Sequence, residues 1–330
     1  MMATGAPSSG SPAAPAALTR VLLTIDTELT WRPGPGWGRW ETAYERSYEA
    51  AGVGVRYQLR VLARHALKAC FFVDPMPACV FGIEPVRRMV EPILEAGQEV
   101  QLHLHPLWVG ARDGQTGSER QLARYGRQAQ RDLIARARDM LVEAGVPEPI
   151  AFRAGNYSAN DDTLRALAEL GFRFDSSHNG HQNPWPSAID LPRDHITPIV
   201  HQGMIEIPVT LIAEGRGSRH LQLCAVSLGE LKAAIEHAGS AGLPIVNIVT
   251  HSFELANRAG TAPNKVHVKR FEDLCAFLSS ERRSYPTVYF SDLDDIPLDT
   301  PSTMLPRARF RRVGRLIEQI WSNQVEERTP

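Results

Sequence analysis

The sequence contains little cysteine: four residues in 330, at positions 70, 79, 224 and 275. No two of them form a C-x-x-C pair, so they give no sign of a cysteine zinc site or of a disulfide framework. Cysteines within or beside apolar runs, as most of these are, behave as small hydrophobic side chains when reduced. We therefore predict a reducing compartment and a cytoplasmic location.

The sequence also lacks a strong net charge and a long apolar run. Its 36 basic and 37 acidic residues nearly cancel, so charge gives no reason to expect nucleic acid as a partner. No stretch approaches the apolar length that crosses a bilayer. With 43% hydrophobic residues the chain can bury one large core, and we expect a soluble protein with a single main domain.

The two ends of the chain differ in composition from its middle. Residues 1–18 are mainly Ala, Pro, Ser and Gly, and we interpret them as a disordered tail. Residues 301–330 form the other end, where apolar residues between 305 and 321 recur at helical spacing opposite arginines. We predict an amphipathic packing helix and tail there; weak contact of 305–321 with an anionic membrane surface is the alternative.

Between these ends, β-branched apolar runs alternate with helical patterns. Strands are predicted near 20–26, 69–73, 99–104, 150–153, 172–175, 204–209, 245–250 and 287–290. Helices are predicted near 45–66, 84–96, 119–144, 160–170, 227–241 and 268–280. This alternation is typical of βαβ units and predicts an α/β fold with a parallel sheet or barrel.

Polar residues follow several of these apolar runs, at the point where each predicted strand ends. They are Asp26 and Glu28, His103 and His105, Arg153, Asp175, and His251. The carboxyl ends of parallel strands meet at one edge, where the active sites of α/β barrels form. This placement favours a metal-assisted hydrolase.

The spacing within two of these groups indicates a metal site. Residues i and i+2 of a strand point to the same face, so Asp26 and Glu28 share a side, as do His103 and His105. Two imidazoles and a carboxylate suit a divalent cation, and three protein ligands with one open position are typical of catalytic zinc. The alternative for the two histidines is a pair of satisfied polar side chains without a metal.

The order of these groups resembles the polysaccharide deacetylase family, or NodB homology domain. Residues 23–28 are similar to its first motif, Thr-Phe-Asp-Asp-Gly, and residues 97–103 resemble the approach to its metal-binding histidines. Residues 152–157 resemble its third motif, Arg-x-Pro-Tyr, residues 175–177 match its fourth, and residues 249–251 stand where the family has Leu-x-His. The similarity extends over roughly residues 20–298 and rests on order and spacing.

This resemblance implies a distorted (β/α) barrel of about seven parallel strands, with a catalytic domain over residues 19–300. It implies a hydrolase that removes an N-acyl group, acetyl before others, from an amino sugar of a polysaccharide or its precursor. An N-acylated sugar or glycan is then the partner, and one divalent metal, zinc by preference, is the cofactor. Glu28, His103 and His105 would bind the metal, with Asp26 open as a ligand in place of Glu28.

The remaining residues receive roles from the same chemistry. Asp26 would be the general base, and Arg153 would orient it, as the resemblance implies. His251 would protonate the departing amine, with Asp175 holding its tautomer and raising its pKa.

The substrate side of the site is assigned to three further residues. A backbone N–H near Asn156 would face the oxyanion, so Asn156 and Tyr157 are assigned to substrate or oxyanion binding. Trp108 is predicted to contact the substrate, because aromatic faces stack on sugar rings. For Trp108, and for the tryptophans at 31, 37, 40 and 185, plain loop packing is the alternative.

Departures from the family pattern keep a second hypothesis open. Thr27 stands where the family has its second Asp, Leu107 stands where it has its second His, and Gly155 and Asn156 replace Pro and Tyr. These changes indicate a divergent branch, and they would also fit a catalytically silent, sugar-binding barrel. An amidohydrolase-type deaminase fits less well, because its His-x-His lies on the first strand. Retention of both histidines beside Asp26 favours the enzyme.

Overall fold

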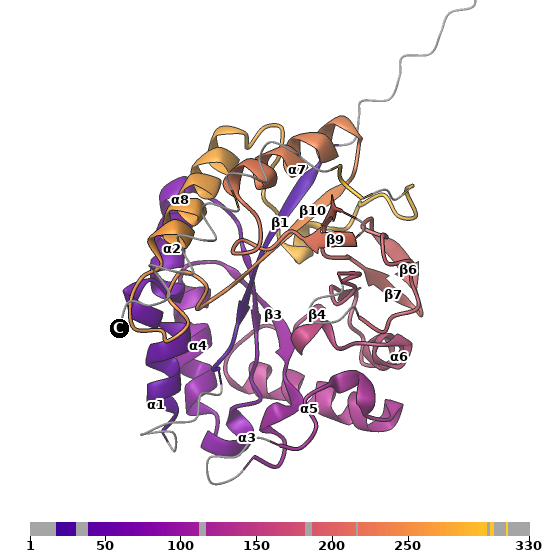
Figure 1. Ribbon diagram of the computed structural model, residues 1–330. Coiled ribbons are helices and arrows are strands. Elements are labelled where there is room, and N and C mark those ends of the chain that lie inside the picture. Colours follow the sequence, from indigo (N-terminus) through magenta and orange to yellow (C-terminus); the bar gives the residue numbers. More distant parts are fainter. Residues whose placement is uncertain are drawn as a thin grey trace, which may run out of the picture.

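A central sheet organises the chain in a computed structural model, which describes residues 18–30, 39–111, 117–181, 187–215, 217–301, 304–306 and 315. The sheet has eight strands in the order β10-β1-β2-β3-β4-β5-β7-β6 (Figure 1). Neighbouring strands are parallel except for β6 and β7. Strands β8 and β9 form a separate hairpin. The bounds are Arg20–Thr27 (β1), Cys70–Val73 (β2), Glu99–Leu104 (β3), Ala151–Ala154 (β4), Phe174–Asp175 (β5), Ile199–His201 (β6), Met204–Glu206 (β7), Leu211–Glu214 (β8), Gly217–His220 (β9) and Ile245–His251 (β10).

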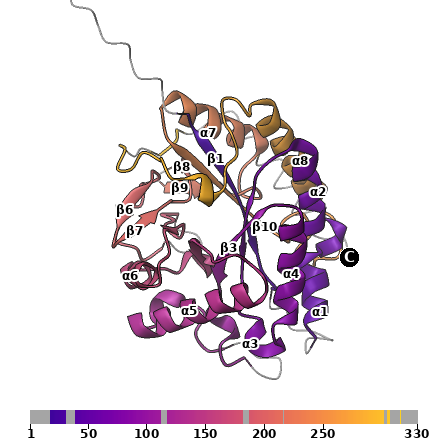
Figure 2. The same ribbon diagram turned by 180° about the vertical axis from the view of Figure 1, so that it is seen from behind.

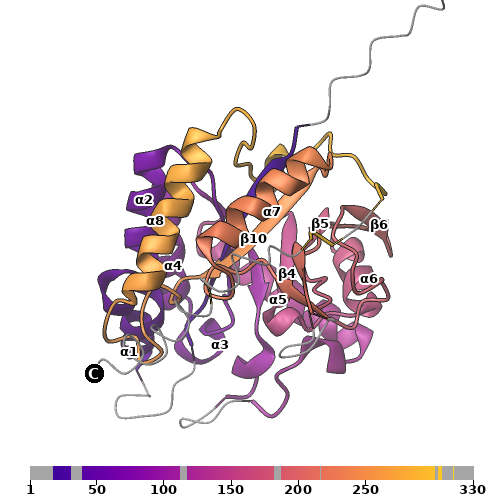
Figure 3. The same cartoon turned by 45° about the horizontal axis from the view of Figure 1, so that its top comes forward.

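Helices connect the parallel strands and cover the outside of the sheet. Helices α2, α4 and α8 lie side by side along one flank, and α5 packs against α6 on another (Figures 1 and 2). Helix α7 lies beside α8 and over β10 (Figure 3). The bounds are Trp40–Ala43 (α1), Val55–His65 (α2), Ala78–Phe81 (α3), Glu84–Glu95 (α4), Arg127–Glu143 (α5), Asp161–Glu169 (α6), Leu228–Ser240 (α7) and Lys265–Ser280 (α8).

This architecture confirms the predicted distorted (β/α) barrel. The seven strands other than β6 run parallel, and the sheet is curled into a half barrel. Two local predictions are wrong. The strand expected at 287–290 is a single bridge from Thr287 to Val21 followed by a 3-10 turn at Phe290–Asp292. The helix expected over 45–66 is broken before α2, because Ala51 and Gly52 have positive φ, 51° and 71°, and Gly54 has a non-helical ψ of −149°.

The inner face of the half barrel is built in layers, because alternate residues of each strand point inward. Strand β1 contributes Leu22, Thr24 and Asp26 to successive layers, while Val21 and Leu23 face the helices. The lowest layer is an apolar plug formed by Leu22, Cys70, Phe72, Ala151, Phe174, Ile207, Ile245, Val288, Phe290 and Leu293. A polar layer around Arg153 lies above this plug, with Phe72 directly against the guanidinium, 4.3 Å from ring centroid to Cζ. The site is therefore supported by a buried, apolar base.

The ends of the chain lie largely outside the described residues, including residues 1–17 and all of 307–330 except Arg315. The predicted tail, the amphipathic helix and its membrane contact therefore stay predictions, as do the domain bounds. Arg315 is buried, with an ion pair to Glu214 and a second to Glu230 at 3.6 Å. Among the described helices, none has the length and apolar character of a membrane span.

Candidate active site

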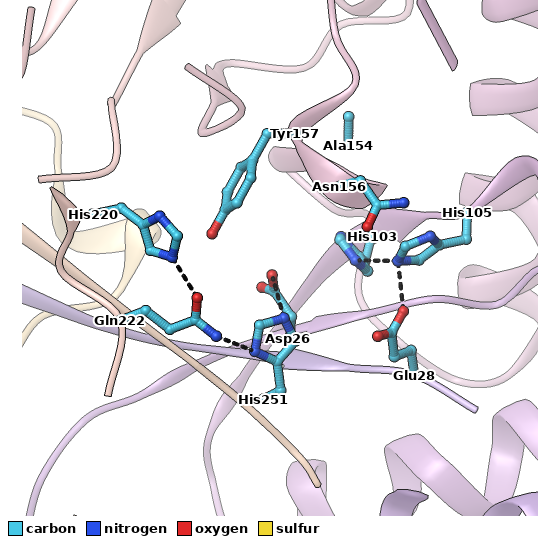
Figure 4. A pocket seen from close by; sticks show the side chains of 10 residues that line it. All are labelled: Asp26, Glu28, His103, His105, Ala154, Asn156, Tyr157, His220, Gln222 and His251. Atoms are coloured by element: carbon cyan, nitrogen blue, oxygen red, sulfur yellow. Dashed lines mark hydrogen bonds and ion pairs between the residues drawn. The ribbon is translucent and has the colours of Figure 1, made fainter. Parts of the chain in front are cut away.

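Polar side chains from the ends of β1, β3, β4 and β10 meet in one pocket. Strand register places Asp26 opposite His251 and His103 opposite Arg153. Beside them is a cavity of about 140 Å³ (Figure 4). Its walls are formed by Asp26, Glu28, His103, His105, Ala154, Asn156, Tyr157, His220, Gln222 and His251.

Glu28, His103 and His105 form a cluster with the spacing of metal ligands, which we call the triad. One ligand atom from each lies within 4.8 Å of the other two. Glu28 Oε2 is 2.5 Å from His105 Nε2, and His105 Nε2 is 3.1 Å from His103 Nε2. The predicted meeting of two imidazoles with a carboxylate is confirmed. Of the two carboxylates considered, Glu28 belongs to this cluster.

The surroundings of the triad fit a divalent cation. His103 Nδ1 is 2.7 Å from the Arg153 carbonyl oxygen, which only accepts, so Nδ1 carries the proton and the Nε2 lone pair faces the triad. His105 packs tightly against Gly155, where a Cβ would lie 2.4 Å from its Nδ1. Two imidazole nitrogens and one carboxylate oxygen are the donor set of a catalytic zinc site with an open position.

The charges of the triad are coupled to each other. Burial opposes ionisation of Glu28, but the charge and hydrogen bond of His105 outweigh it and lower its pKa to about 2. Burial likewise opposes a charge on His105, but Glu28 raises the pKa of that imidazole to about 9. At His103 burial dominates and lowers the pKa to about 4. An anionic Glu28 and a neutral His103 are the forms that bind a cation.

Arg153 is fully buried beneath the pocket, and its five N–H donors all have acceptors. Nη1 donates to Asp26 Oδ1 at 2.6 Å and to Thr24 Oγ1 at 2.9 Å. Nε donates to the Ser176 carbonyl oxygen, and Nη2 donates to Ser176 Oγ and Asn247 Oδ1. The expected contact of Arg153 with Asp26 is therefore present. It leaves Asp26 Oδ2 facing His251 Nε2 at 3.9 Å.

His251 is held by Glu254, not by Asp175, so that part of the sequence prediction is wrong. His251 Nδ1 donates to Glu254 Oε1 at 2.8 Å. Thr250 Oγ1, Gln222 Nε2 and Cys224 Sγ donate to the same carboxylate. Burial opposes a charge on His251, but the hydrogen bond and charge of Glu254 outweigh it and raise its pKa to about 9. Burial is similarly outweighed at Glu254, where His251 lowers the pKa to about 2.

Asp175 instead connects the end of β5 to the end of β4 through Ser177. Its carboxylate accepts hydrogen bonds from Ser177 Oγ at 2.8 Å and Ser177 N at 3.1 Å, and Ser177 Oγ accepts from Ala154 N. Strand pairing places Asp175 opposite Glu206. Burial raises the pKa of Asp175, and burial together with the charge of Asp175 raises the pKa of Glu206. Protonation of one carboxyl relieves the repulsion that two adjacent buried charges would have.

Asn156 and Tyr157 both line the pocket, and their assignment to substrate or oxyanion binding stays a prediction. They follow β4 in a short 3-10 turn, Gly155–Tyr157. Both have positive φ, 54° for Asn156 and 55° for Tyr157. Such backbone geometry is costly for a bulky side chain and persists where the surroundings enforce it, often at functional sites.

Trp108 does not reach the pocket, so its predicted contact with substrate is wrong. It is 1% exposed, and its ring packs edge-on against Phe81 with centroids 5.9 Å apart. Trp40 packs in the same way on Tyr44. The alternative of loop packing therefore holds for both. The tryptophans at 31, 37 and 185 lie outside the described residues.

Sequence reasoning missed four residues at or beside the pocket: Asp74, His220, Gln222 and Glu254. Asp74 follows β2, and burial raises its pKa to about 7 against the opposing charge of His105. Its place after an apolar strand was the same signal that marked Asp26. Glu254 lies three residues after His251, a spacing that offered a weak signal. His220 and Gln222 come from the β8–β9 hairpin and the loop after it, which no sequence motif marked.

Comparison with solved structures places this geometry in a known fold. A Mycobacterium smegmatis protein assigned as a polysaccharide deacetylase aligns with 90% of this chain and 99% of its own length, at a TM-score of 0.53 and 19% identity. The chain has the polysaccharide deacetylase fold. The fold implied by the sequence resemblance is thus confirmed.

Other comparisons limit what this deacetylase fold says about activity. The 4-alpha-glucanotransferase of Thermococcus litoralis aligns with 94% of this chain at a TM-score of 0.52 and 12% identity, and the alignment covers 47% of that enzyme. No protein-family model matches the sequence, and no curated protein matches it. Since proteins of different names share the fold, the activity has to be argued from the pocket itself.

Proposed function

We propose that the protein is a metal-dependent hydrolase that removes an N-acyl group, acetyl before others, from an amino sugar of a polysaccharide or its precursor. The observation that carries the proposal is one pocket in which the Glu28–His103–His105 triad, the Asp26–Arg153 pair and the His251–Glu254 pair meet. The deacetylase named among the structural neighbours supports the choice of reaction.

Amide hydrolysis needs an attacking water, a base and a stabilised oxyanion, and the pocket can supply each. Glu28, His103 and His105 would hold one divalent cation, zinc by preference, which when bound polarises the acyl oxygen and lowers the pKa of water. Asp26 takes a proton from the attacking water through Oδ2, since Arg153 engages Oδ1. A backbone N–H at Asn156 or Tyr157 supports the oxyanion.

Collapse of the tetrahedral intermediate requires a proton on the departing nitrogen. His251 supplies it from Nε2, because Nδ1 is engaged by Glu254 and the raised pKa keeps the imidazole protonated near neutral pH. Glu254 therefore holds the tautomer of His251 and raises its pKa, the role that the sequence prediction gave to Asp175. The products are the free amino sugar and the carboxylic acid.

A silent, sugar-binding barrel is the competing function, and the departures at Thr27 and Leu107 motivated it. Glu28 supplies the carboxylate that Thr27 lacks, and His105 supplies the second imidazole that Leu107 lacks. Asp26, the proposed base, is paired with Arg153, and His251, the proposed acid, is paired with Glu254. These contacts support the enzyme over the silent barrel.

The proposal is tested by metal content and acetate release together. We expect about one divalent cation per chain and release of acetate from N-acetylated amino-sugar oligomers. Chelation should abolish this release, and a His103→Ala, His105→Ala double variant should lose both metal and activity. A wild-type protein that binds the metal and the oligomer but releases no acetate would favour the silent barrel instead.

A further inference from the structure

The pocket has two chemically different sides. In Figure 4 the triad lies on one side of Asp26 and His251, and Tyr157, His220 and Gln222 lie on the other. The first side holds the ligand atoms for a cation. The side chains of the second side have no part in the acyl chemistry described above, yet they carry hydrogen-bonding groups.

The Tyr157 hydroxyl is the most informative group on this second side. It is buried, it points into the pocket, and it has no hydrogen-bond partner within the part of the chain that the structure describes. Tyr48 shows the ordinary arrangement, because its buried hydroxyl donates to the Met89 carbonyl oxygen at 2.6 Å. A buried hydroxyl without a partner is costly, so its presence in a native fold calls for a functional explanation.

The backbone supports the same conclusion independently. Tyr157 and its neighbour Asn156 both have positive φ, a strained conformation for residues other than glycine. In this conformation the Tyr157 ring packs with Val209 and Val249 while its hydroxyl lies in the pocket. Burial raises the pKa of Tyr157, so the hydroxyl stays protonated and can both donate and accept a hydrogen bond.

A chain of hydrogen bonds fixes the wall beside Tyr157. Glu254 is anionic, so Gln222 must present its Nε2 to it and its Oε1 to His220. His220 therefore carries its proton on Nε2, and its buried Nδ1 is an acceptor with no partner among the described residues. Main-chain bonds of Leu221 and Leu223 to Val249 of β10 hold this segment against the strand that ends in His251.

We propose that Tyr157, with His220 and Gln222 beside it, binds a hydroxyl group of the leaving amino sugar next to the scissile amide. This inference rests on the proposed function. The subsite adjoins His251, which protonates the leaving amine, and lies away from the triad, where the acyl oxygen is held. A sugar hydroxyl donates and accepts at once, as Tyr157 does, so this wall selects a polyhydroxylated leaving group over an aromatic one.

Substitution Tyr157→Phe removes only the hydroxyl and tests the proposal. With metal-loaded protein, we expect kcat/KM for an N-acetylglucosamine oligomer to fall about tenfold, the value of one lost hydrogen bond. Hydrolysis of nitrophenyl acetate, whose leaving group has no sugar hydroxyl, should change less than about twofold, on the same reasoning. Thermal stability should not fall, because the hydroxyl has no partner in the protein to lose.

Tyr48→Phe is the matched control, since it removes a buried hydroxyl that is paired and remote from the pocket. It should lower thermal stability and leave both activities unchanged. Equal loss on both substrates with Tyr157→Phe would place the hydroxyl at the oxyanion and overturn the subsite, as would no loss on either. If wild-type protein hydrolyses neither substrate, the proposed function itself fails; if it hydrolyses only the aryl ester, the amino-sugar substrate and this subsite fall together.

Discussion

Arg153 shows how one buried residue organises the pocket. A guanidinium without water is stable only when its charge and all its donors are matched, and here Asp26, Thr24, Ser176 and Asn247 match them. The same bonds leave Asp26 a single free oxygen, which faces His251. Removing one partner of such a pair typically costs about 3–5 kcal/mol, because the other charge is left buried without compensation.

Substitution should distinguish the role of Asp26, which lies in β1, from that of Glu28, which follows β1. Asp26→Asn should retain the metal while lowering kcat by roughly a hundredfold or more, because a base is lost and the triad is untouched. Glu28→Gln should weaken metal binding, because a ligand is lost. Metal content by elemental analysis and acetate release, measured on both variants, check this; the reverse pattern would exchange the two roles.

The Glu254 carboxylate should set the alkaline limit of activity. A general acid works only when protonated, so activity falls as pH rises through the pKa of His251, which Glu254 raises. Glu254→Gln removes that charge, lowers the His251 pKa, and should move the alkaline limb of the kcat/KM profile to lower pH. Asp175→Asn serves as the control, because Asp175 contacts Ser177 and should leave this limb in place. If Asp175→Asn moved the alkaline limb and Glu254→Gln did not, Asp175 and not Glu254 would be the residue that raises the His251 pKa.

At the scale of elements, the strand ends carry the chemistry and the turns after them adjust it. The two-residue period of β1 and β3 brings Glu28, His103 and His105 together. The turn after β4 then shapes the space around them, since Gly155 is the position against which the His105 ring packs. A change in that turn should act on the metal site without touching a ligand.

Gly155→Ala should therefore weaken metal binding. The added Cβ would lie 2.4 Å from His105 Nδ1, so the imidazole must shift away from its ligand position. Loss of such supporting geometry typically costs about 10-fold to 100-fold in metal affinity. Gly126→Ala is the matched control, because no atom lies within 4 Å of a Cβ at that helix cap. Equal metal affinity in both variants, measured by competition with a chelator, would show that the His105 ring tolerates the shift.

These elements also show how far the sequence could be interpreted. Apolar runs with polar residues at their ends predicted the parallel sheet and the meeting of two imidazoles with a carboxylate, because these follow from strand periodicity. The Asp26–Arg153 pair was expected from the family resemblance. The partner of His251 could not be predicted, because it depends on the order of strands in the sheet. Strands β1, β2, β3 and β4 lie between β10 and β5, and Asp175 of β5 is opposite Glu206 of β7. Trp108 was misassigned for a similar reason: only tertiary packing decides that its ring turns toward Phe81.

At the scale of the whole molecule, the pocket joins strands that the chain separates widely. Glu28 follows β1, His103 lies in β3 and His105 follows β3, and β2 lies between these strands in the sheet. A cation held by the triad would therefore connect two segments that one intervening strand separates in the sheet. Since the unfolded chain does not present these ligands together, binding the metal is linked to folding.

Metal should accordingly stabilise the entire domain. A ligand that binds only the folded state at about a hundred times its Kd adds about 2.7 kcal/mol to the free energy of unfolding. We expect the thermal midpoint of chelator-treated protein to rise when zinc is restored, and this rise to vanish in the His103→Ala, His105→Ala double variant. Asp26→Asn, which leaves the triad intact, should keep the full rise. A shift of the same size in the double variant would mean that zinc stabilises the protein from another place, and would separate the metal from the pocket.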